Sequence, residues 1–309
     1  MSKKIVVFGS YVTDLTARCE AFPTEGQTVK GSSFKDGPGG KGSNQAVAAH
    51  RAGADVTFIS RIGEDHYGSE MLRFYREEGM STDGVIVSKD EATGCALIMV
   101  NEKTSQNEIV VIPAACDHFT EAEIAEAAEK FLPGADLLVT QLETNYDANQ
   151  QMLKAAKALG IPTILNPAPA RPLTDETLSL CDIVIPNETE ASLITGMQML
   201  PDCSNAPELA RKLMEMGAKK VIITLGAHGV YATDGEREET TAPRKAGTVV
   251  DTTGAGDAFV GGFASGIARG YDFFKAVRWG NTVSSIAVTR YGTAPAMPYE
   301  AEVEQFFEG

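Results

Sequence analysis

The sequence predicts an α/β fold: a doubly wound, mostly parallel sheet flanked by helices, with a small β-sheet outside it. Short β-branched runs alternate with amphipathic stretches along most of the chain. The runs are apolar throughout, which suits parallel strands that are buried on both faces. Several amphipathic stretches end in glycine, as helices commonly do. Repeated alternation of this kind predicts βαβ units.

The expected elements follow in chain order. The β-branched runs predict strands at 5–8, 55–60, 137–140, 163–165, 183–185 and 221–224. The amphipathic stretches between them predict helices at 44–52, 121–132, 149–159 and 208–216. Gly53, Gly160 and Gly217 are the expected helix ends. After Gly254 the chain is rich in small residues and in helical pattern.

Two segments break this alternation. Residues 13–37 contain no convincing helix, and residues 93–112 read as two alternating strands joined by a polar turn. The two segments are expected to pair into a small sheet outside the main one. From the residues alone, a lid over a cleft and an ordinary decorated edge are both open interpretations.

Composition excludes several classes of function. The 309 residues carry 27 basic and 42 acidic side chains, a net charge of −15, which argues against nucleic acid or an anionic membrane as the main partner. The five scattered cysteines fit isolated thiols in a reducing compartment, so we expect a cytoplasmic protein. No apolar stretch approaches the length of a membrane span.

The glycine-rich run 37–42 satisfies the dinucleotide-binding spacing G-x-G-x-x-G literally. That fingerprint must follow the first strand directly, and here the first strand ends far upstream. No G-x-x-x-x-G-K-[ST] sequence is present either. The pattern therefore argues against an NAD-dependent oxidoreductase and against a P-loop enzyme.

A second glycine-rich turn, at 249–259, combines a predicted anion site with a carboxylate. An apolar run meets Gly254-Ala255-Gly256-Asp257, and a helix of small residues follows at once. Free backbone N–H groups at such a helix start form an anion site. Asp257 in the first turn is either a helix cap or a general base that takes a proton from a hydroxyl attacking a bound phosphate.

Several motifs together resemble the ribokinase-like (PfkB) sugar kinases. The stretch 251–257, D-T-T-G-A-G-D, is similar to their C-terminal signature, and 39–46, G-G-K-G-S-N-Q-A, to their N-terminal one. N-E-T-E at 187–190 and T-L-G-A-H-G at 224–229 are similar to two further family motifs, and Q-L-E at 141–143 and N-P-A-P-A at 166–170 to those of the ribose-phosphorylating members. The matches occur in family order along nearly the whole chain.

The resemblance implies an ATP-dependent sugar kinase, with D-ribose phosphorylated at O5 as the first expectation and another small sugar, 2-deoxyribose or a nucleoside as the alternative. It implies that Asp257 is the base and that Gly254, Ala255 and Gly256 form the anion hole. The sugar-binding residues that match the family are Asp14, Gly40, Lys41, Asn44, Glu143 and Asp257. Carboxylates can accept hydrogen bonds from a polyol, and lysine and asparagine can donate them.

For the nucleotide, the resemblance implies contacts from Asn187, Thr224, Gly226, Gly229, Gly256 and Asn281. Glu190 would order water around Mg²⁺, although Asn187 and Glu190 also fit a helix capping box. A K⁺ site is implied at Asp251, Thr253, Ala287, Arg290 and Gly292, where the sixth position of the family pattern is Ala296.

The family resemblance divides the chain into a main domain, 1–12, 38–92 and 113–309, and a β-lid, 13–37 and 93–112, through which a homodimer is expected. Two departures from the family pattern concern the sugar pocket. Val12 stands where an asparagine is usual, and 115–117 read A-C-D instead of G-A-N. A non-enzymatic sensor is the third alternative, but it should have lost Asp257 or the Gly254–Gly256 turn, and both are intact.

Overall fold

The computed structural model describes residues 3–104 and 106–308, and within them nine strands form one sheet in the order β13-β12-β11-β10-β9-β8-β1-β4-β5. Its strands are β1 (Lys4–Phe8), β4 (Asp55–Gly63), β5 (Val85–Ser88), β8 (Leu137–Thr140), β9 (Thr163–Leu165), β10 (Ile183–Val184), β11 (Lys220–Thr224), β12 (Val230–Thr233) and β13 (Glu238–Thr241). Pairing is parallel from β5 to β11 and antiparallel from β11 to β13. All six strands predicted from apolar runs lie in this sheet, so the doubly wound, mostly parallel fold is confirmed.

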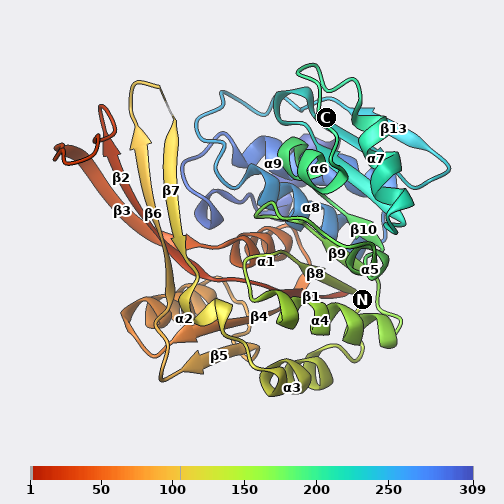
Figure 1. Cartoon of the computed structure of the whole chain (residues 1–309), viewed down its shortest axis with the longest axis horizontal. Coiled ribbons are helices and arrows are strands. Elements are labelled where there is room, and N and C mark those ends of the chain that lie inside the picture. The colour runs from red at the N-terminus through yellow and green to blue at the C-terminus, as the bar shows by residue number, and fades with distance from the viewer. Residues whose placement is uncertain (1–2, 105, 309) are drawn as a thin grey trace.

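Helices cover both faces of the sheet (Figure 1). One core contains residues of α1 (Lys41–Arg51), α2 (His66–Glu77), α8 (Ala255–Ala268), α9 (Phe273–Ala287) and α10 (Glu300–Glu308). The other contains residues of α3 (Glu121–Phe131), α4 (Tyr146–Ala158), α5 (Asp175–Ser179), α6 (Glu188–Thr195) and α7 (Ala206–Glu215). The four helices expected from amphipathic patterns are present, within a few residues of their predicted ends.

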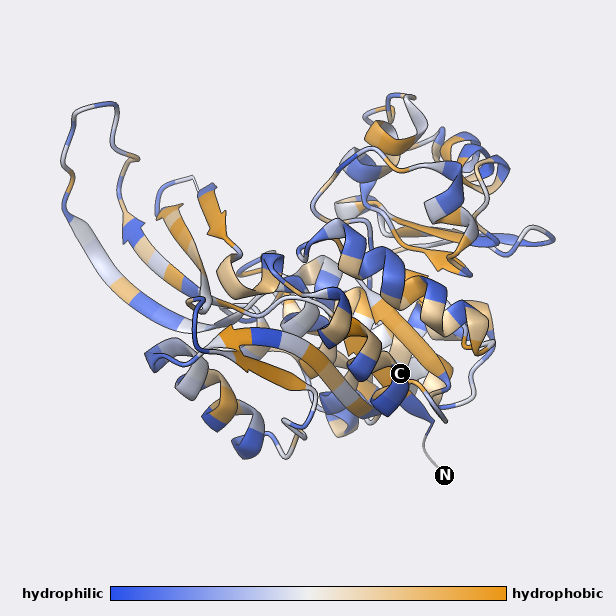
Figure 2. Cartoon of the chain, turned by 60° about the horizontal axis from the view of Figure 1, so that its bottom comes forward, coloured by the Kyte–Doolittle hydropathy of each residue, from blue (hydrophilic) through white to orange (hydrophobic). Residues whose placement is uncertain are grey.

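Strand β1 shows why the apolar runs lack alternation. Ile5 and Val7 belong to one core, and Val6 and Phe8 belong to the other. A strand with both faces buried needs apolar side chains at every position. In Figure 2 orange prevails in several strands of the main sheet, whereas the helices carry blue bands.

The predicted helix-terminal glycines have the expected backbone. Gly53, Gly160 and Gly217 have φ of 95°, 69° and 124°, in the region that favours glycine. Gly37 to Gly39 lie in a strand, not in a turn that follows β1, which agrees with the rejection of a dinucleotide fingerprint.

A second, four-stranded sheet projects from the main body, in the order β3-β2-β6-β7 among the described residues (Figure 1). It consists of β2 (Val12–Cys19), β3 (Gly31–Gly39), β6 (Gly94–Asn101) and β7 (Asn107–Ile112). β6 and β7 form the expected hairpin, and β2 and β3 are also antiparallel. The central pair β2–β6 is parallel, so the two hairpins join side by side. The pairing extends just beyond 13–37, to Val12 and Gly39.

Short 3₁₀ turns complete the chain: η1 (Ala114–Asp117), η2 (Gly226–His228) and η3 (Ala294–Ala296). Of the helices in the described part of the chain, none combines the length and the apolar character that crossing a membrane requires.

Candidate active site

The candidate site lies at one edge of the main sheet, where the parallel strands end. The polar segments that follow β1, β8, β9 and β10 meet there, and helices α1, α6 and α8 begin there. Open α/β sheets bind ligands at the carboxyl ends of their strands. Helix N-termini at the same place supply N–H groups and positive dipole ends for an anion.

Asp257 sits at the centre of this edge, in the first turn of α8. Its two carboxylate oxygens accept hydrogen bonds from Asn44 Nδ2 and Gln45 Nε2, each at 2.9 Å. It does not cap its own helix, because the N-cap is Gly254 and no side chain caps it. The Asp257 side chain is therefore directed at α1, which removes the helix-cap interpretation.

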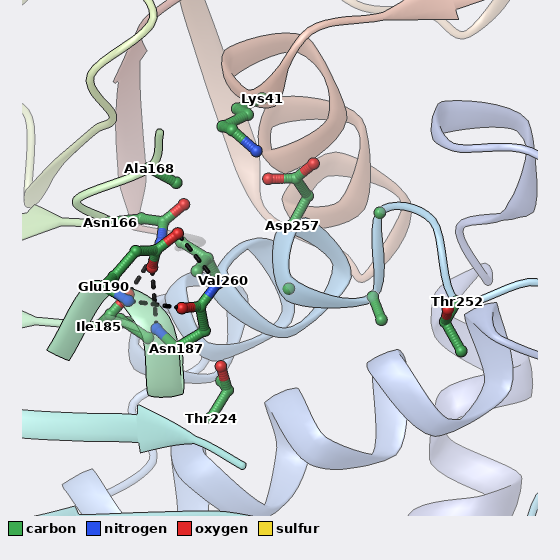
Figure 3. Close-up of a pocket in the computed structure, with 13 residues that line it drawn as sticks. Lys41, Asn166, Ala168, Ile185, Asn187, Glu190, Thr224, Thr252, Asp257 and Val260 are labelled. Atoms are coloured by element: carbon green, nitrogen blue, oxygen red, sulfur yellow. Dashed lines mark hydrogen bonds between the residues drawn. The ribbon is translucent and has the colours of Figure 1, made fainter. Parts of the chain in front are cut away.

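The pKa of Asp257 is raised by burial. The ammonium group of Lys41 and the two amide donors lower it, whereas Glu143 raises it. In Figure 3 the Lys41 side chain extends towards the Asp257 carboxylate. Burial lowers the pKa of Lys41 in turn, but Asp257 and Glu143 outweigh that effect and the pKa is raised. The lysine is thus held charged beside the carboxylate.

The turn before α8, where an anion hole is expected, differs from the expectation in one respect. Gly254 has φ of 76°. The backbone N–H of Ala255 donates to the Thr252 carbonyl oxygen at 3.1 Å, so it is occupied inside the turn. The N–H groups of Gly256 and Asp257 lie in the first turn, where helices leave donors without an intrahelical partner.

The sugar-binding set from the family resemblance converges at the start of α1. The backbone N–H of Lys41 donates to Glu143 Oε2 at 2.9 Å, and the Ser10 hydroxyl donates to the same oxygen at 2.5 Å. Gly40, with φ of 88°, lies so close to Ser10 and Val12 that a Cβ would fall 2.8 Å from the Val12 nitrogen. This close approach explains the glycine.

Asn44 has a buried acceptor without a partner in the described part of the chain. Its side chain is buried, its Nδ2 group donates to Asp257, and its Oδ1 atom has no partner among the described residues. A buried acceptor without a donor costs about 1–3 kcal/mol. A ligand hydroxyl would remove this cost.

Asp14 belongs to the root of the small sheet. Thr293 Oγ1 donates to Asp14 Oδ2 at 3.0 Å. Burial raises the pKa of Asp14 to about 6, the Thr293 hydrogen bond lowers it, and the charges of Glu143 and Asp257 raise it. The carboxylates of Asp14, Glu143 and Asp257 therefore lie close enough for their negative charges to repel one another. Lys41 is the cation that opposes this effect.

A pocket of about 160 Å³ continues from Asp257 towards the N-terminus of α6 (Figure 3). Asn187 caps this helix and forms a reciprocal capping box with Glu190, with both backbone N–H to side-chain contacts at 2.8 Å. The helix-capping interpretation is thus correct. Burial raises the pKa of Glu190 to about 7, against the backbone N–H of Asn187 and the charge of Lys41. Glu190 also lines the pocket, so capping leaves it available to a ligand.

The expected nucleotide-binding residues are partly assembled. Thr224 lines the same pocket and its strand bridges to Asn187. Gly226 begins the turn η2 beside it, and Gly229 follows that turn. A Cβ on Gly229 would lie 2.1 Å from the Thr241 carbonyl oxygen, so this glycine has a structural reason of its own. Asn281 is buried in α9 and donates to the Ala242 carbonyl oxygen at 2.7 Å.

The residues expected to hold K⁺ lie in two adjoining segments. Asp251 Oδ1 accepts from the backbone N–H of Thr253 at 2.9 Å, and its Oδ2 accepts from that of Gly292 at 3.2 Å. The Ala287 carbonyl oxygen accepts from the N–H of Arg290 at 3.0 Å, which closes the end of α9. Asp251 thereby joins the loop before α8 to the loop after α9.

The family departures lie beside the sugar-binding set. Val12 is buried and packs with Ala96 and Ile98 of the small sheet. Cys116 in η1 is buried, and its thiol donates to the Arg61 carbonyl oxygen at 3.0 Å. Burial raises the pKa of this thiol.

Three residues at the site carried no expected role: Ser10, Gln45 and Thr293. Gln45 follows Asn44 in the N-terminal signature, and this position was its only signal. Ser10 and Thr293 lie far from Glu143 and Asp14 in sequence, so nothing local indicates their contacts.

Residues 2–300 match the model of the pfkB family carbohydrate kinases. Ribokinase of Haemophilus influenzae is 38% identical over 310 residues, covering 100% of this chain and 99% of the relative. Deoxyribokinase of Salmonella typhi is 34% identical, covering 98% and 97%. The structure of Arabidopsis thaliana ribokinase complexed with ribose and ATP superposes with a TM-score of 0.89 at 29% identity, over 100% of both chains.

Proposed function

The chain belongs to the pfkB family of carbohydrate kinases, and from this premise we propose that it transfers the γ-phosphoryl group of ATP to O5 of D-ribose, giving ribose 5-phosphate and ADP. The family makes it an ATP-dependent phosphotransferase with an alcohol acceptor. The observation that carries the proposal is the buried carboxylate of Asp257, held by two amides at the N-terminus of α8 and beside Lys41.

Asp257 is the proposed base. Its carboxylate accepts the proton of the sugar hydroxyl as that oxygen bonds to the γ-phosphorus, and the bond to the β–γ bridging oxygen breaks. The phosphoryl group carries negative charge throughout, so its stabilisation matters more than covalent chemistry. We assign that task to Lys41 and to the start of α8, from Gly254 to Gly256, where the helix dipole and the N–H groups other than the occupied one of Ala255 favour an anion.

Ribose is proposed to lie between α1 and the root of the small sheet. Asp14 and Glu143 are acceptors for its hydroxyls, Lys41 and Asn44 are donors, and the backbone of Gly40 allows close approach. The unpartnered Asn44 Oδ1 atom supports a hydroxyl donor at this place. The relatives named ribokinase support ribose as the particular polyol.

The nucleotide is proposed to occupy the side of the pocket formed by Asn187, Thr224 and the η2 turn, with Gly226 and Gly229, and to reach Gly256. Asn281, on α9, would lie beside the adenine ring of the nucleotide. The polar lining by Asn166, Asn187 and Thr224 supports a ligand with many acceptors.

Mg²⁺ is proposed to enter with ATP and to be held through water by Glu190. The donor set fits, because Mg²⁺ commonly keeps several waters and takes one or two carboxylates plus substrate phosphates. When bound, the ion neutralises charge on the phosphate oxygens. Glu190 itself is set in place by the capping box with Asn187.

K⁺ is proposed to be held by Asp251, Thr253, Ala287, Arg290 and Gly292, mostly through carbonyl oxygens. A carboxylate and carbonyls form a hard oxygen donor set, which fits an alkali cation, and Asp251 already brings the two loops together. The cation would fix the loop that begins α8.

A second candidate substrate is 2-deoxyribose. Val12 is apolar and buried, so it cannot pair with a sugar hydroxyl, and a sugar that lacks one leaves no Val12 donor unpaired. The similarity to a deoxyribokinase supports this alternative.

We propose a homodimer through the small sheet. Strand β7 is one of its two edges, and the consecutive residues Ile109, Val110, Val111 and Ile112 are each 41–60% exposed. An exposed apolar edge strand is commonly paired with another strand or covered, and a second copy of the chain would offer the same patch.

We also propose a cytoplasmic location, which the five free thiols support.

The experiment is a phosphorylation screen with purified protein, Mg²⁺ and ATP over pentoses, hexoses and nucleosides, followed by ADP release. Phosphorus NMR of the product then identifies the hydroxyl that is modified. We expect ribose to be phosphorylated at O5. Phosphorylation of a hexose or nucleoside with no activity on either pentose would refute the assignment of ribose and leave the family assignment standing.

A further inference from the structure

The side chain of Gln45 links Asp257 to the ends of the neighbouring strands. It is fully buried. Its Nε2 group lies 2.9 Å from Asp257 Oδ1 and 2.9 Å from Asn166 Oδ1, and its Oε1 atom accepts from Gln141 Nε2 at 2.6 Å. Both protons of the amide and its oxygen are thus engaged.

The direction of this network is fixed by chemistry. A carboxylate and a backbone carbonyl only accept hydrogen bonds. Asp257 therefore requires the NH₂ end of Gln45 to face it. The Ile185 carbonyl oxygen, 2.8 Å from Asn166 Nδ2, likewise requires the oxygen of Asn166 to face Gln45. A flipped Gln45 would place its oxygen against two acceptors.

Two successive side chains of α1 donate hydrogen bonds to the Asp257 carboxylate. Asn44 donates to Oδ2 of Asp257 and Gln45 donates to Oδ1. With one donor on each oxygen, the carboxylate group cannot turn about its Cβ–Cγ bond without losing both contacts. Gln45 is also hydrogen-bonded to Gln141 and Asn166, whereas the Asn44 Oδ1 atom has no partner among the described residues.

We propose that Gln45 is a positioning residue that fixes the plane of the Asp257 carboxylate and favours its ionised form. This inference rests on the proposed role of Asp257 as the base. The sugar and the nucleotide need not touch Gln45, so its effect should fall on the chemical step and on its pH dependence, not on substrate binding.

The charges around Asp257 do not replace this donor. Lys41 is the cation that faces it, and Asp14, Glu143 and Glu190 are carboxylates in the same field. Changing Gln45 removes none of these four groups. The Gln45 hydrogen bond lowers the pKa of Asp257, so its loss raises that pKa. The acid limb of the kcat profile then moves to higher pH.

The test is Gln45→Met, which keeps the length of the side chain without a donor, compared with Gln141→Met. Gln141 is equally buried and donates to Gln45 but has no hydrogen bond to Asp257. Both variants leave buried polar groups unpaired, so both should lower the melting temperature. Gln45→Met should move the acid limb upward and lower kcat by roughly tenfold to a hundredfold, as misplaced catalytic groups do. Gln141→Met keeps the Gln45 donor to Asp257, so its effect on the limb and on kcat should be clearly smaller.

The KM for ATP and for the sugar should change less than kcat in Gln45→Met. A wild-type pH profile with kcat within twofold would overturn the proposal, and so would an equal shift in both variants. If Gln45→Met does not fold, Gln45→Glu keeps the size and sets a second carboxyl against Asp257. Two such groups share a proton, so its acid limb must also move upward, and an unchanged limb overturns the proposal.

These outcomes separate the inference from the proposed function. Inactive Asp257→Asn with unperturbed Gln45 variants removes only the positioning role. Active Asp257→Asn removes the base itself, whatever the Gln45 variants do.

Discussion

The hydroxyl of Thr293 donates a hydrogen bond to the carboxylate of Asp14 at 3.0 Å, across 279 positions of sequence. The same hydroxyl lies 3.1 Å from the Pro38 carbonyl oxygen. Thr293 follows Gly292, whose backbone N–H donates a hydrogen bond to Asp251. One threonine thus connects the root of the small sheet to the loop of the proposed cation site.

Thr293→Val should therefore weaken sugar binding. Valine keeps the shape and removes the donor, and a lost hydrogen bond of about 0.5–1.5 kcal/mol corresponds to a ~2–12-fold higher sugar KM. The KM for ATP should hardly change. Steady-state kinetics with both substrates measure this. Thr293→Ser is the control and should keep the wild-type value, and a wild-type sugar KM in Thr293→Val would refute the role of this contact.

Asp257→Asn should abolish turnover while ATP binding is kept. The amide has the size of the carboxyl but cannot accept the hydroxyl proton, and loss of a general base costs ~10²–10⁴-fold in rate. Turnover is measured by ADP release and ATP affinity by calorimetry. Turnover within tenfold of the wild type would exclude Asp257 as the base.

Sugar binding should weaken at acid pH. Asp14 has a pKa of about 6, raised from 3.8 by burial, and only its ionised form accepts hydrogen bonds from two hydroxyls without donating. The sugar KM should rise as the pH falls from 7 to 5. A pH series of kcat/KM for the sugar measures this, and Asp14→Asn should show a higher KM without the Asp14 titration.

The raised pKa of Asp14 affects the stability of the unliganded protein in the opposite direction to sugar binding: stability falls as the pH rises. A carboxyl whose pKa is higher in the folded state stabilises that state below 3.8 and loses this contribution as the pH rises through about 6. The unliganded Asp14→Asn protein should therefore be more stable than the wild type at pH 8. Thermal unfolding without sugar checks this, and a lower melting temperature at pH 8 would contradict a desolvated charge at Asp14.

Activity should need Mg²⁺ and should be higher in K⁺ than in Na⁺. A cage of carbonyl oxygens with Asp251 suits a large, weakly hydrated cation, which would fix the start of α8. Initial rates in K⁺, Na⁺ and tetramethylammonium buffers measure the effect, and Asp251→Ala should remove the preference. Equal rates of the wild-type protein in all three buffers would count against the site.

Val12→Asn should raise the preference for ribose over 2-deoxyribose. Val12 packs with Ala96 and Ile98, so the wild type has no polar group there to discriminate by a hydroxyl. An asparagine adds a partner worth about 0.5–1.5 kcal/mol, or ~2–12-fold in kcat/KM. The ratio of kcat/KM for the two sugars measures this, and an unchanged ratio would show that Val12 does not face the sugar hydroxyls.

The fold could be predicted largely from hydrophobic patterning. Strands such as β8 and β9 begin and end where the apolar runs do, because burial on both faces leaves little choice of residue. The parallel pairing of β2 with β6 was not predictable. The two segments were expected to pair into one small sheet, but neither carries a local signal for the direction in which its strands meet those of the other.

The motifs of the candidate site were also readable, because glycine turns and helix starts are local features. The sequence by itself determined the doubly wound sheet and the run of residues from Gly254 to Asp257. Only the tertiary structure decided that Asp257 is held by Gln45 and that Asp14 is held by Thr293. Local patterns report backbone conformation and burial, whereas a hydrogen bond between distant side chains depends on how the elements pack in three dimensions.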